Sequence, residues 1–333
     1  VDLEIDVVEA DTRELGAFAG FGTFEGVIVG ASLHERNIFG SGRQLGGHAE
    51  YTSRGIAGEI AYSDRWLFDS ALRFDATLFS VDKELEGYDK AEIGLRAEVV
   101  WPVSSELEFS VFSHLGSVDI YEADIADPFL GDRTYRVGSI GITGRYDTRD
   151  DPARPRLGTH LSTTLEYAPA EWFGEVEFLR GTVRLTQHFP IGDRSEFRVG
   201  ARAGFITTGD GGEPPIDLRF FSGGATSVRS FEERHLGPDD GDGHPLGGEF
   251  FSTFNAEYTF PLVGLLRGAA FVDAGNLLPN SGDASFDDMH YAAGLGLRLD
   301  LPTGPLRVDY GVNLNRGEGE PSGSFHIGVG IAF

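Results

Sequence analysis

Strict alternation of apolar with small or polar residues marks the end of this chain. Large apolar residues occupy every odd position from Phe325 to Phe333, and the even positions hold His326, Gly328, Gly330 and Ala332. Because successive side chains of a strand point to opposite faces, this pattern predicts a β-strand with one apolar face. A water-soluble sandwich would bury such a face in its core. The same period along most of a long chain instead indicates a barrel with lipid outside and a polar lumen inside.

Four further segments show the same alternation, at 72–78, 250–260, 291–299 and 306–314. Their polar faces carry arginine and carboxylate residues together, which a dry soluble core tolerates poorly. Turn residues separate such segments along the whole chain and divide it into about sixteen strands, an even number of the kind found in bacterial single-chain barrels.

Composition supports an all-β membrane protein. The chain has 47 glycines and 26 phenylalanines, which suits many strands joined by turns. No window approaches the roughly 18 apolar residues of a membrane helix, so a bilayer would have to be crossed by a closed barrel. We therefore predict a transmembrane antiparallel β-barrel of about 16 strands. The absence of cysteine excludes disulfides and thiolate metal sites.

The charge excludes nucleic acid as a partner. The formal net charge is -26, and no segment is rich in lysine and arginine. Acidic residues gather in predicted loops at 239–242 and 318–320. The start, Val1–Glu4, is charged and lacks the apolar region of a signal peptide. We expect that such a leader has been removed or that the sequence begins within a longer chain.

One connection is much longer than the others. About forty residues separate the strand near 196–205 from the strand that starts near Gly248, far above the usual loop length. A loop of this size is expected to have a role, such as folding into the lumen. Residues 1–10 are predicted to form one further strand that is unlike the strands of the barrel. We therefore expect residues 1–13 to end a preceding soluble module and residues 14–333 to form the barrel, with a lumen loop at about 208–247.

The long loop contains Phe220–Phe231, in which Gly223 and Gly224 precede Val228-Arg229-Ser230-Phe231. This segment resembles the lumen loop of the BamA and TamA outer-membrane assembly family, where Val/Ile-Arg-Gly-Phe/Tyr follows a Gly-Gly segment. The sequence departs from that pattern at Ser230, where the family usually has glycine.

Other stretches resemble the same family in the same order. They are the turn Asn37–Gly42, the mid-barrel turn Tyr146–Pro152, the two strands after the loop (Gly247–Tyr258 and Phe271–Asn276), the final hairpin at Pro302–Arg307 and the aromatic last strand. Residues 1–10 resemble the last strand of a periplasmic POTRA domain. The resemblance covers essentially the whole chain and implies an integral protein of the bacterial outer membrane.

Arg229 is a candidate for a buried ion pair. An arginine is permanently charged and presents a planar fork of donors, so inside a barrel it needs a carboxylate partner. Glu257 lies on the predicted lumen face of the next strand, and Asp273 on that of the strand after. The resemblance implies that Arg229 contacts both. We call Val228, Arg229, Ser230, Phe231, Glu257 and Asp273 the lumen-loop lock. Two alternatives are that Arg229 is a solvated loop charge and that the lock only stabilises the barrel.

No catalytic motif is present. The sequence shows no nucleophile elbow, no paired metal-binding histidines and no P-loop. The histidines are scattered, and Asp239–Gly243 lacks the downstream glutamate of a calcium loop. The sequence therefore predicts neither an enzyme nor a bound cofactor.

The predicted first strand, Leu15–Gly22, is rich in glycine, which weakens strand pairing. Closure of the barrel must join this strand to the last one, so their pairing is expected to be the weakest. An opened edge exposes backbone donors and acceptors to which an incoming strand can add. We call the residues on the two sides the gate seam: Gly16, Gly20, Gly22, Gly328, Gly330 and Phe333.

The sequence thus leads to a functional hypothesis. The chain would help to fold and insert β-barrel proteins into the outer membrane through this lateral gate. Its partners would be outer-membrane lipids, unfolded β-barrel clients and accessory periplasmic lipoproteins. Two alternatives are a polypeptide-secretion pore of the two-partner type and a passive solute channel.

Overall fold

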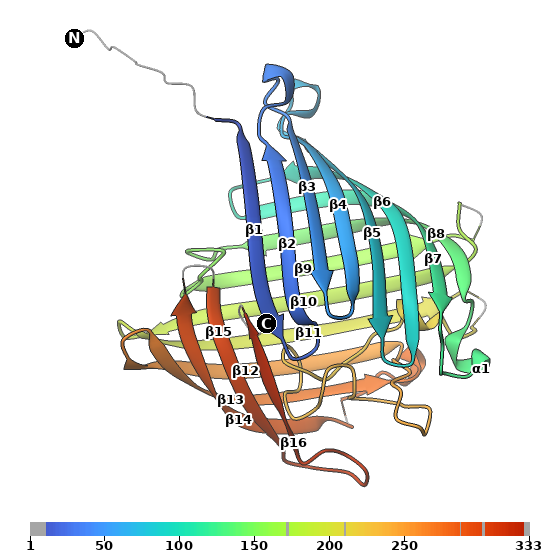
Figure 1. Cartoon of the computed structure of the whole chain (residues 1–333), viewed down its shortest axis with the longest axis vertical. Helices are drawn as coiled ribbons and strands as arrows, with labels where there is room; N and C mark the ends of the chain where they lie inside the picture. Colours follow the sequence, from blue (N-terminus) through green and yellow to red (C-terminus); the bar gives the residue numbers. More distant parts are fainter. Residues whose placement is uncertain (1–10, 171–172, 210, 287, 302–303, 330–333) are drawn as a thin grey trace.

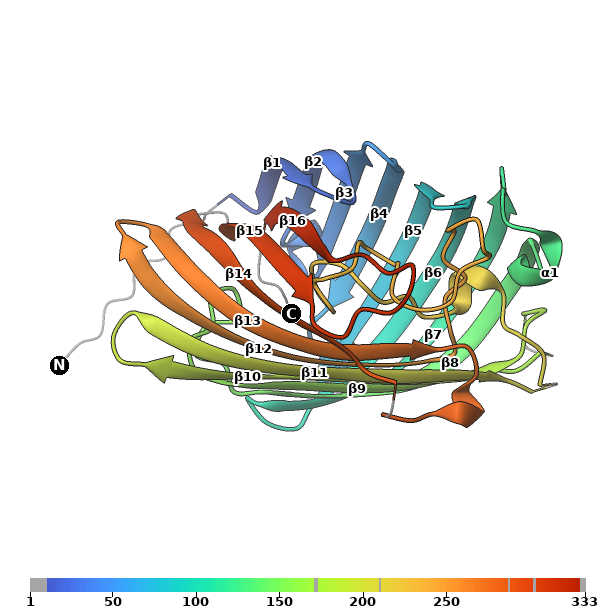
Figure 2. The same ribbon diagram turned by 90° about the horizontal axis from the view of Figure 1, so that it is seen from below.

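The computed structural model describes residues 11–170, 173–209, 211–286, 288–301 and 304–329. In these residues, sixteen antiparallel strands follow one another around a nearly closed barrel, each beside its neighbours in the sequence (Figures 1 and 2). The strands are β1 (Arg13–Gly22), β2 (Gly26–Glu35), β3 (Gln44–Thr52), β4 (Gly55–Asp64), β5 (Arg73–Leu85), β6 (Tyr88–Pro102), β7 (Leu107–Tyr121), β8 (Thr134–Asp147), β9 (Gly158–Ala168), β10 (Phe178–Ile191), β11 (Ser195–Thr208), β12 (Phe250–Val263), β13 (Leu266–Leu278), β14 (His290–Leu301), β15 (Gly304–Asn313) and β16 (Gly323–Val329).

Helices occur only as short pieces in the connections that the structure describes. They are α1 (Asp127–Leu130) and the 3-10 turns η1 (Ile38–Gly40), η2 (Leu67–Asp69), η3 (Ile216–Leu218) and η4 (Ser281–Asp283). None of the described helices has the length and apolar character that crossing a bilayer requires.

The predicted alternation of faces is confirmed. On β16, Phe325 is 61% exposed on the outer surface, whereas the His326 side chain is buried in the lumen. On β12, Phe254 and Tyr258 face outward, and Thr253, Asn255, Glu257 and Thr259 are buried. The apolar outer surface and the charged lumen are the two environments that a membrane barrel separates.

Phenylalanine rings cover glycines on neighbouring strands, which explains part of the unusual composition. Seven such pairs lie directly opposite each other in register: Phe18 and Gly30, Phe79 and Gly94, Phe112 and Gly141, Phe205 and Gly181, Phe251 and Gly204, Phe260 and Gly268, and Phe271 and Gly294. In each pair the ring occupies the space that a Cβ on the glycine would need. A ring that fits only over glycine helps to fix the strand register.

The two rims of the barrel differ. We call the rim where β1 starts the N-terminal rim; it carries short connections, including 36–43 and 65–72, which stand at the top of Figure 1. The opposite rim, here the loop rim, carries the 41-residue connection 209–249 between β11 and β12. This length agrees with the predicted loop of about forty residues.

The turn of the final hairpin differs from the sequence prediction. Pro302–Arg307 was expected in this hairpin, and Gly304–Arg307 do form the start of β15, one of its two strands, but the turn before β16 is at 314–322. Pro302 and Thr303 lie outside the described residues. Residues 1–10 also lie outside them, so the expected preceding module and its boundary stay predictions; β1 begins at Arg13.

Candidate functional site in the barrel lumen

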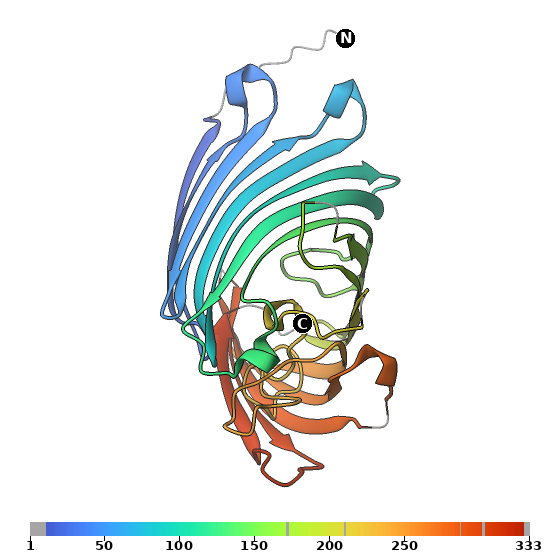
Figure 3. The same ribbon diagram turned by 90° about the vertical axis from the view of Figure 1, so that its right-hand side faces the viewer.

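The long connection 209–249 folds into the barrel. Its trace passes between the two walls of the barrel and beneath β16, as the views along the barrel show (Figures 2 and 3). Its base is held by backbone hydrogen bonds between Phe220 and Gly248. The loop side chains Ile216, Val228, Phe231 and Leu236 are almost fully buried. The lumen is therefore occupied by a packed segment of the chain's own backbone.

Two glycines shape the tip of the loop. Gly223 and Gly224 have φ values of 101° and 90°, which favour glycine. The Gly224 N–H donates to the Phe231 carbonyl at 3.1 Å, and the Phe231 N–H donates to the Val228 carbonyl at 3.2 Å. These bonds close a tight turn that carries Arg229 at its centre.

Arg229 is fully buried between two strands. Its Nε donates to Asp273 Oδ2 at 2.9 Å, its Nη2 to Asp273 Oδ1 at 2.8 Å and its Nη1 to Glu257 Oε2 at 2.6 Å. The Arg229 backbone N–H also donates to Asp273 Oδ2. The guanidinium lies 3.4 Å from the centroid of the Phe271 ring. The structure thus brings together Arg229 of the loop, Glu257 of β12 and Asp273 of β13. Val228 and Phe231, which flank Arg229 in the loop sequence, are buried as well.

Ser230 lies at the position where the family pattern has glycine. Its side chain is completely buried, and its Oγ has no hydrogen-bond partner in the part of the chain that the structure describes. A hydroxyl buried in this way costs free energy, on the order of 1–3 kcal/mol. Nothing in the structure explains why serine stands here.

The charges around Arg229 form a larger network. Arg198 of β11 donates to Glu257 at 3.0 Å, and Arg298 of β14 bridges Glu257 and Asp309 at 2.9 and 2.7 Å. Three arginines therefore face three carboxylates across five strands and the loop, so the charges of these six residues balance. Paired, hydrogen-bonded charges are the arrangement that burial requires.

Sequence reasoning did not assign the outer members of this network. Arg298, Arg307 and Asp309 lie on faces that the alternation predicts for the lumen, but no role was inferred for them. Arg198 of β11 is also a buried lumen-facing arginine to which no role was assigned. Opposite charges on adjacent lumen-facing strands, as at Arg298 and Asp309, could have indicated these ion pairs.

The loop tip also contacts the closing strand. His326 of β16 has Nε2 at 3.1 Å from the Arg229 carbonyl. On β15, Gly311 leaves room for the same backbone, because a Cβ there would collide with the Arg229 carbonyl. The loop tip thus links the ion-pair network to β15 and β16, next to the gate seam.

The outer part of the loop binds the opposite wall. Asp217 Oδ2 lies 3.0 Å from Lys90 Nζ of β6, and the Tyr135 hydroxyl of β8 donates to Asp217 Oδ1 at 2.6 Å. Arg234 donates to the Tyr88 hydroxyl at 2.9 Å. His235 pairs with Glu86, in the turn before β6, at 2.6 Å. The loop therefore spans the lumen between the β6–β8 wall and the β12–β14 wall.

The gate seam has few contacts in the described residues. All fifteen other neighbouring pairs form extended ladders, whereas in the described residues a backbone hydrogen bond from the Thr23 N–H to the Ile327 carbonyl, at 3.0 Å, joins the two ends. Gly22 lies at this contact, and Gly328 is the next residue along β16. Gly16 and Gly20 lie farther along β1, where they face Ser32 and Ile28 of β2. Gly330 and Phe333 lie outside the described residues.

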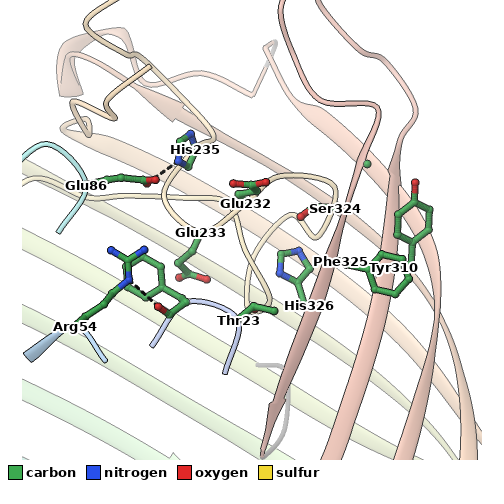
Figure 4. A pocket seen from close by; sticks show the side chains of 12 residues that line it. Thr23, Arg54, Glu86, Glu232, Glu233, His235, Tyr310, Ser324, Phe325 and His326 are labelled. Atoms are coloured by element: carbon green, nitrogen blue, oxygen red, sulfur yellow. Dashed lines mark hydrogen bonds and ion pairs between the residues drawn. The ribbon is translucent and has the colours of Figure 1, made fainter. Parts of the chain in front are cut away.

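A cavity of about 400 Å³ adjoins the seam (Figure 4). Thr23 at the end of β1 and Ser324 and His326 of β16 line one side, and Glu232, Glu233 and His235 of the loop line the other (Figure 4). Burial raises the pKa of the Glu233 carboxyl in the loop. The cavity connects the two ends of the sheet with the lumen loop.

In the described part of the chain, no cluster of three or more His, Asp or Glu side chains could hold a metal ion. In the acidic segment 239–243, the Asp240 carboxylate accepts hydrogen bonds from the backbone N–H groups of Asp242 and His244 and contacts the His244 ring at 2.8 Å. This carboxylate therefore serves to shape the loop.

Comparison with known proteins agrees with the fold. Curated relatives include the outer membrane protein assembly factor BamA of Nitratidesulfovibrio vulgaris, 26% identical over 345 residues, covering 100% of this chain and 43% of the relative. Outer envelope protein 80 of Arabidopsis thaliana is 23% identical over 372 residues, covering 99% of this chain and 47% of the relative. The chain thus spans less than half the length of these relatives.

Solved structures show the same barrel. BamA of Haemophilus ducreyi, in a form lacking POTRA domains 1–3, superposes with a TM-score of 0.85 at 15% identity, covering 96% of this chain and 70% of that one. CdiB of Escherichia coli gives a TM-score of 0.65 at 13% identity, covering 97% and 63%. At these identities the likeness concerns the fold.

A family comparison covers most of the sequence. The model of the Omp85 superfamily domain matches residues 37–333, which include fourteen of the sixteen strands and the whole lumen loop. Together with the sixteen-stranded barrel and the outer-membrane relatives, this match shows that the chain is an integral outer-membrane barrel that belongs to the Omp85 superfamily.

Proposed function

We propose that this barrel assists the folding and insertion of outer-membrane β-barrel proteins, and that clients enter at the gate seam between β1 and β16. The single observation that carries the proposal is the contrast at the seam. Within the described residues, one backbone hydrogen bond joins the two ends of a sheet whose other neighbours form full ladders. Strand edges with free donors and acceptors accept added strands.

The lumen-loop lock supports this proposal because it lies beside the seam. The Arg229 carbonyl contacts His326 on β16, and Arg229 itself is held by Glu257 and Asp273. The loop thereby links β16 to β12 and β13. We propose that the lock holds β16 in place while β1 moves away from it. The proposed clients are unfolded β-barrel proteins, with accessory periplasmic lipoproteins as further partners; the relatives named as assembly factors support this role. This activity requires no catalytic residue or cofactor.

A disulfide across the seam tests the proposal. This chain has no cysteine, and the bond from Thr23 to Ile327 places Gly22 opposite Gly328 in an antiparallel pair. The full-length protein with Gly22→Cys and Gly328→Cys is reconstituted in vesicles, and insertion of a urea-unfolded barrel client is followed by its heat-resistant migration. Oxidation is expected to stop insertion, and reduction to restore it.

A matched disulfide controls for the cross-link itself. Ala17→Cys with Ala31→Cys joins β1 to β2, which already form a ladder, and should leave insertion unchanged. Normal insertion by the oxidised seam variant would overturn the proposal.

A polypeptide-secretion pore is the second candidate, favoured by the similarity of fold to CdiB. Such a pore would pass its substrate through the lumen, so the seam disulfide would leave transport intact, whereas a variant that fixes the lumen loop would stop it. A passive solute channel fits less well, because the packed loop occupies the lumen.

A further inference from the structure

Two turns on the N-terminal rim have the same unusual structure. They join β2 to β3 and β4 to β5, and each contains a 3-10 turn with a phenylalanine at its centre. Phe39 has φ 53° and ψ 26°, and Phe68 has φ 53° and ψ 37°. A left-handed conformation is unfavourable for a bulky residue.

The serine hydrogen bonds of the two turns correspond. Ser41 donates through its N–H and its Oγ to the Ile38 carbonyl, at 3.0 and 2.6 Å. Ser70 donates in the same way to the Leu67 carbonyl, at 3.1 and 2.6 Å. Both turns have the sequence Arg-x-(Ile/Leu)-Phe-x-Ser, at 36–41 and 65–70, and hold the phenylalanine in the same strained conformation.

This conformation directs the aromatic side chains away from the protein. Phe39 is 102% exposed and Phe68 is 89% exposed, and Trp66 beside it is 67% exposed. The curls of the two turns stand on the same rim, beyond the ends of β2 to β5 (Figures 1 and 3). Full exposure of a phenylalanine ring to water is unfavourable, so these rings would be more stable in an apolar environment.

The rings continue the lipid-facing surface of the barrel. Leu33, Leu45 and Ile60 are exposed on the outer faces of the same strands. β1 to β4 contain only 10, 10, 9 and 10 residues. At about 3.3 Å per residue and a tilt of about 35–45°, such strands are about 21–27 Å tall, close to the roughly 25 Å apolar band of outer-membrane barrels. The turns therefore begin at the level of the lipid headgroups.

Ion pairs at the same level agree with this position. Arg13 pairs with Glu35 and Arg43 with Asp64, both at 3.0 Å, and Arg36 pairs with Glu14. The arginines of these pairs are largely exposed, as charged groups are where the apolar band gives way to headgroups and water. Their charges are balanced by the carboxylates, so the attraction of the rim to lipid rests on the aromatic rings.

We infer that Phe39 and Phe68, with Trp66, insert into the phospholipid interface at the N-terminal rim and anchor the β1–β5 part of the wall, next to the seam. Aromatic residues are enriched at membrane interfaces, and outer-membrane barrels carry girdles of them. Here the anchor comes from the turns, and the partner is the lipid surface.

Fluorescence quenching by lipid tests the inference. Phe39→Cys and Phe68→Cys, made singly, are labelled with an environment-sensitive fluorophore, and the full-length protein is reconstituted in phosphatidylethanolamine and phosphatidylglycerol vesicles with or without brominated acyl chains. Brominated lipid is expected to lower the emission at both positions at least twofold. Ser105→Cys, in the exposed β6–β7 turn of the same rim, is the control and should be quenched by aqueous iodide only.

Each other outcome overturns the inference. Iodide quenching at positions 39 and 68 equal to that at 105 would show that the rings lie in water. Protection from both quenchers would show that a protein segment covers them. The readout does not involve clients, so it stands apart from the test of the seam.

A glycine variant separates anchoring from folding. Glycine accepts the left-handed conformation without strain. Phe39→Gly with Phe68→Gly should therefore leave the urea midpoint in detergent micelles unchanged or higher, while insertion of the unfolded protein into the same vesicles slows at least threefold. A lower midpoint in micelles, or an unchanged insertion rate, would contradict the anchor.

Discussion

At the scale of single residues, Arg229 is the centre of the lumen. It makes three hydrogen bonds to Asp273 and one to Glu257. The two carboxylates are not equivalent, because Glu257 also pairs with Arg198 and Arg298, whereas the cationic partner of Asp273 in the described network is Arg229. Removal of Arg229 therefore leaves Asp273 as the buried charge without its counter-ion.

Because the two carboxylates differ in their counter-ions, we expect Arg229 to be coupled energetically more strongly to one of them than to the other. Arg229→Ala should lower the free energy of unfolding by about 3–5 kcal/mol, the cost of breaking a buried pair. In double-mutant cycles measured by urea unfolding in micelles, the coupling of Arg229 to Asp273 should exceed its coupling to Glu257. Equal coupling to the two carboxylates would contradict the geometry. A charge swap of Arg229 with Glu257 should rescue poorly, since the new arginine would meet Arg198 and Arg298.

His244 should titrate at a higher pH than an ordinary histidine. Its hydrogen bond with Asp240, helped by the charge of that carboxylate, raises the pKa of His244 above its usual value. A raised folded-state pKa means that the stabilising contact is complete below the unfolded value of about 6.5 and is lost as pH rises through the folded value. NMR titration of the ring should show the pKa falling toward about 6.5 in Asp240→Asn. Asp242→Asn, the control, should change it less, and an unchanged pKa in Asp240→Asn would exclude the contact.

At the scale of elements, the loop 209–249 acts as a strut between two walls. The Asp217 contacts hold its outer part to β6 and β8, and Arg229 holds its tip to β12 and β13. These two anchors are chemically independent, so each can be released without the other.

Asp217→Asn should loosen only the outer part of the loop. The substitution removes the ion pair with Lys90 and weakens the bond from Tyr135, at a cost of about 1–3 kcal/mol in local docking. Hydrogen exchange by mass spectrometry should rise in peptides over 213–222 and stay unchanged over 226–232. Asp242→Asn, in the exposed acidic segment 239–243, is the matched control. Faster exchange over both segments would show that the loop docks as one unit.

Gly311 of β15 should be essential for docking of the tip. A Cβ at this position would strike the Arg229 carbonyl, which is backbone and cannot rotate away. Gly311→Ala should therefore exclude the tip from its site and raise protease cleavage near 226–232, while the barrel still forms. Gly328→Ala on the adjacent strand is the control, because its nearest neighbour is the flexible Arg307 side chain at 3.6 Å. Undisturbed docking in Gly311→Ala would contradict the placement of the loop.

The sequence predicted the elements better than their contacts across the lumen. Alternation identified the outer and inner faces of β12, β14, β15 and β16, since a strand period is local. The position of Asp217 beside Lys90 depends on where a long loop ends up after the barrel closes. The shared conformation of Phe39 and Phe68 was also missed, although Arg36–Ser41 and Arg65–Ser70 both have the pattern Arg-x-(Ile/Leu)-Phe-x-Ser. The placement of Arg229 came from a resemblance, and the role of the lock remains a proposal.

At the scale of the whole molecule, stability should be unevenly distributed around the barrel. The strands β1 to β4 have 9 or 10 residues, whereas β5 to β8 have 13 to 15. The loop anchors described above fall on β6, β8 and β11 to β16. The quarter formed by β1 to β4 therefore combines short ladders, a weakly joined edge and, among the described residues, no hydrogen bond or ion pair to the loop.

This quarter should open first. Regions with few buried contacts and short hydrogen-bonded ladders open locally most easily. The backbone amides of β1 to β4 should therefore exchange hydrogen at least tenfold faster than those of β12 to β14 in lipid nanodiscs. Closing the seam with the Gly22→Cys and Gly328→Cys disulfide should slow exchange in β1 and β2 and leave β12 to β14 unchanged. The Ala17→Cys and Ala31→Cys disulfide, within β1 and β2, should have a smaller effect, because it does not close the edge. Equal exchange rates around the whole barrel would mean that the wall opens as one cooperative unit, and the seam would then have no special freedom to admit a strand.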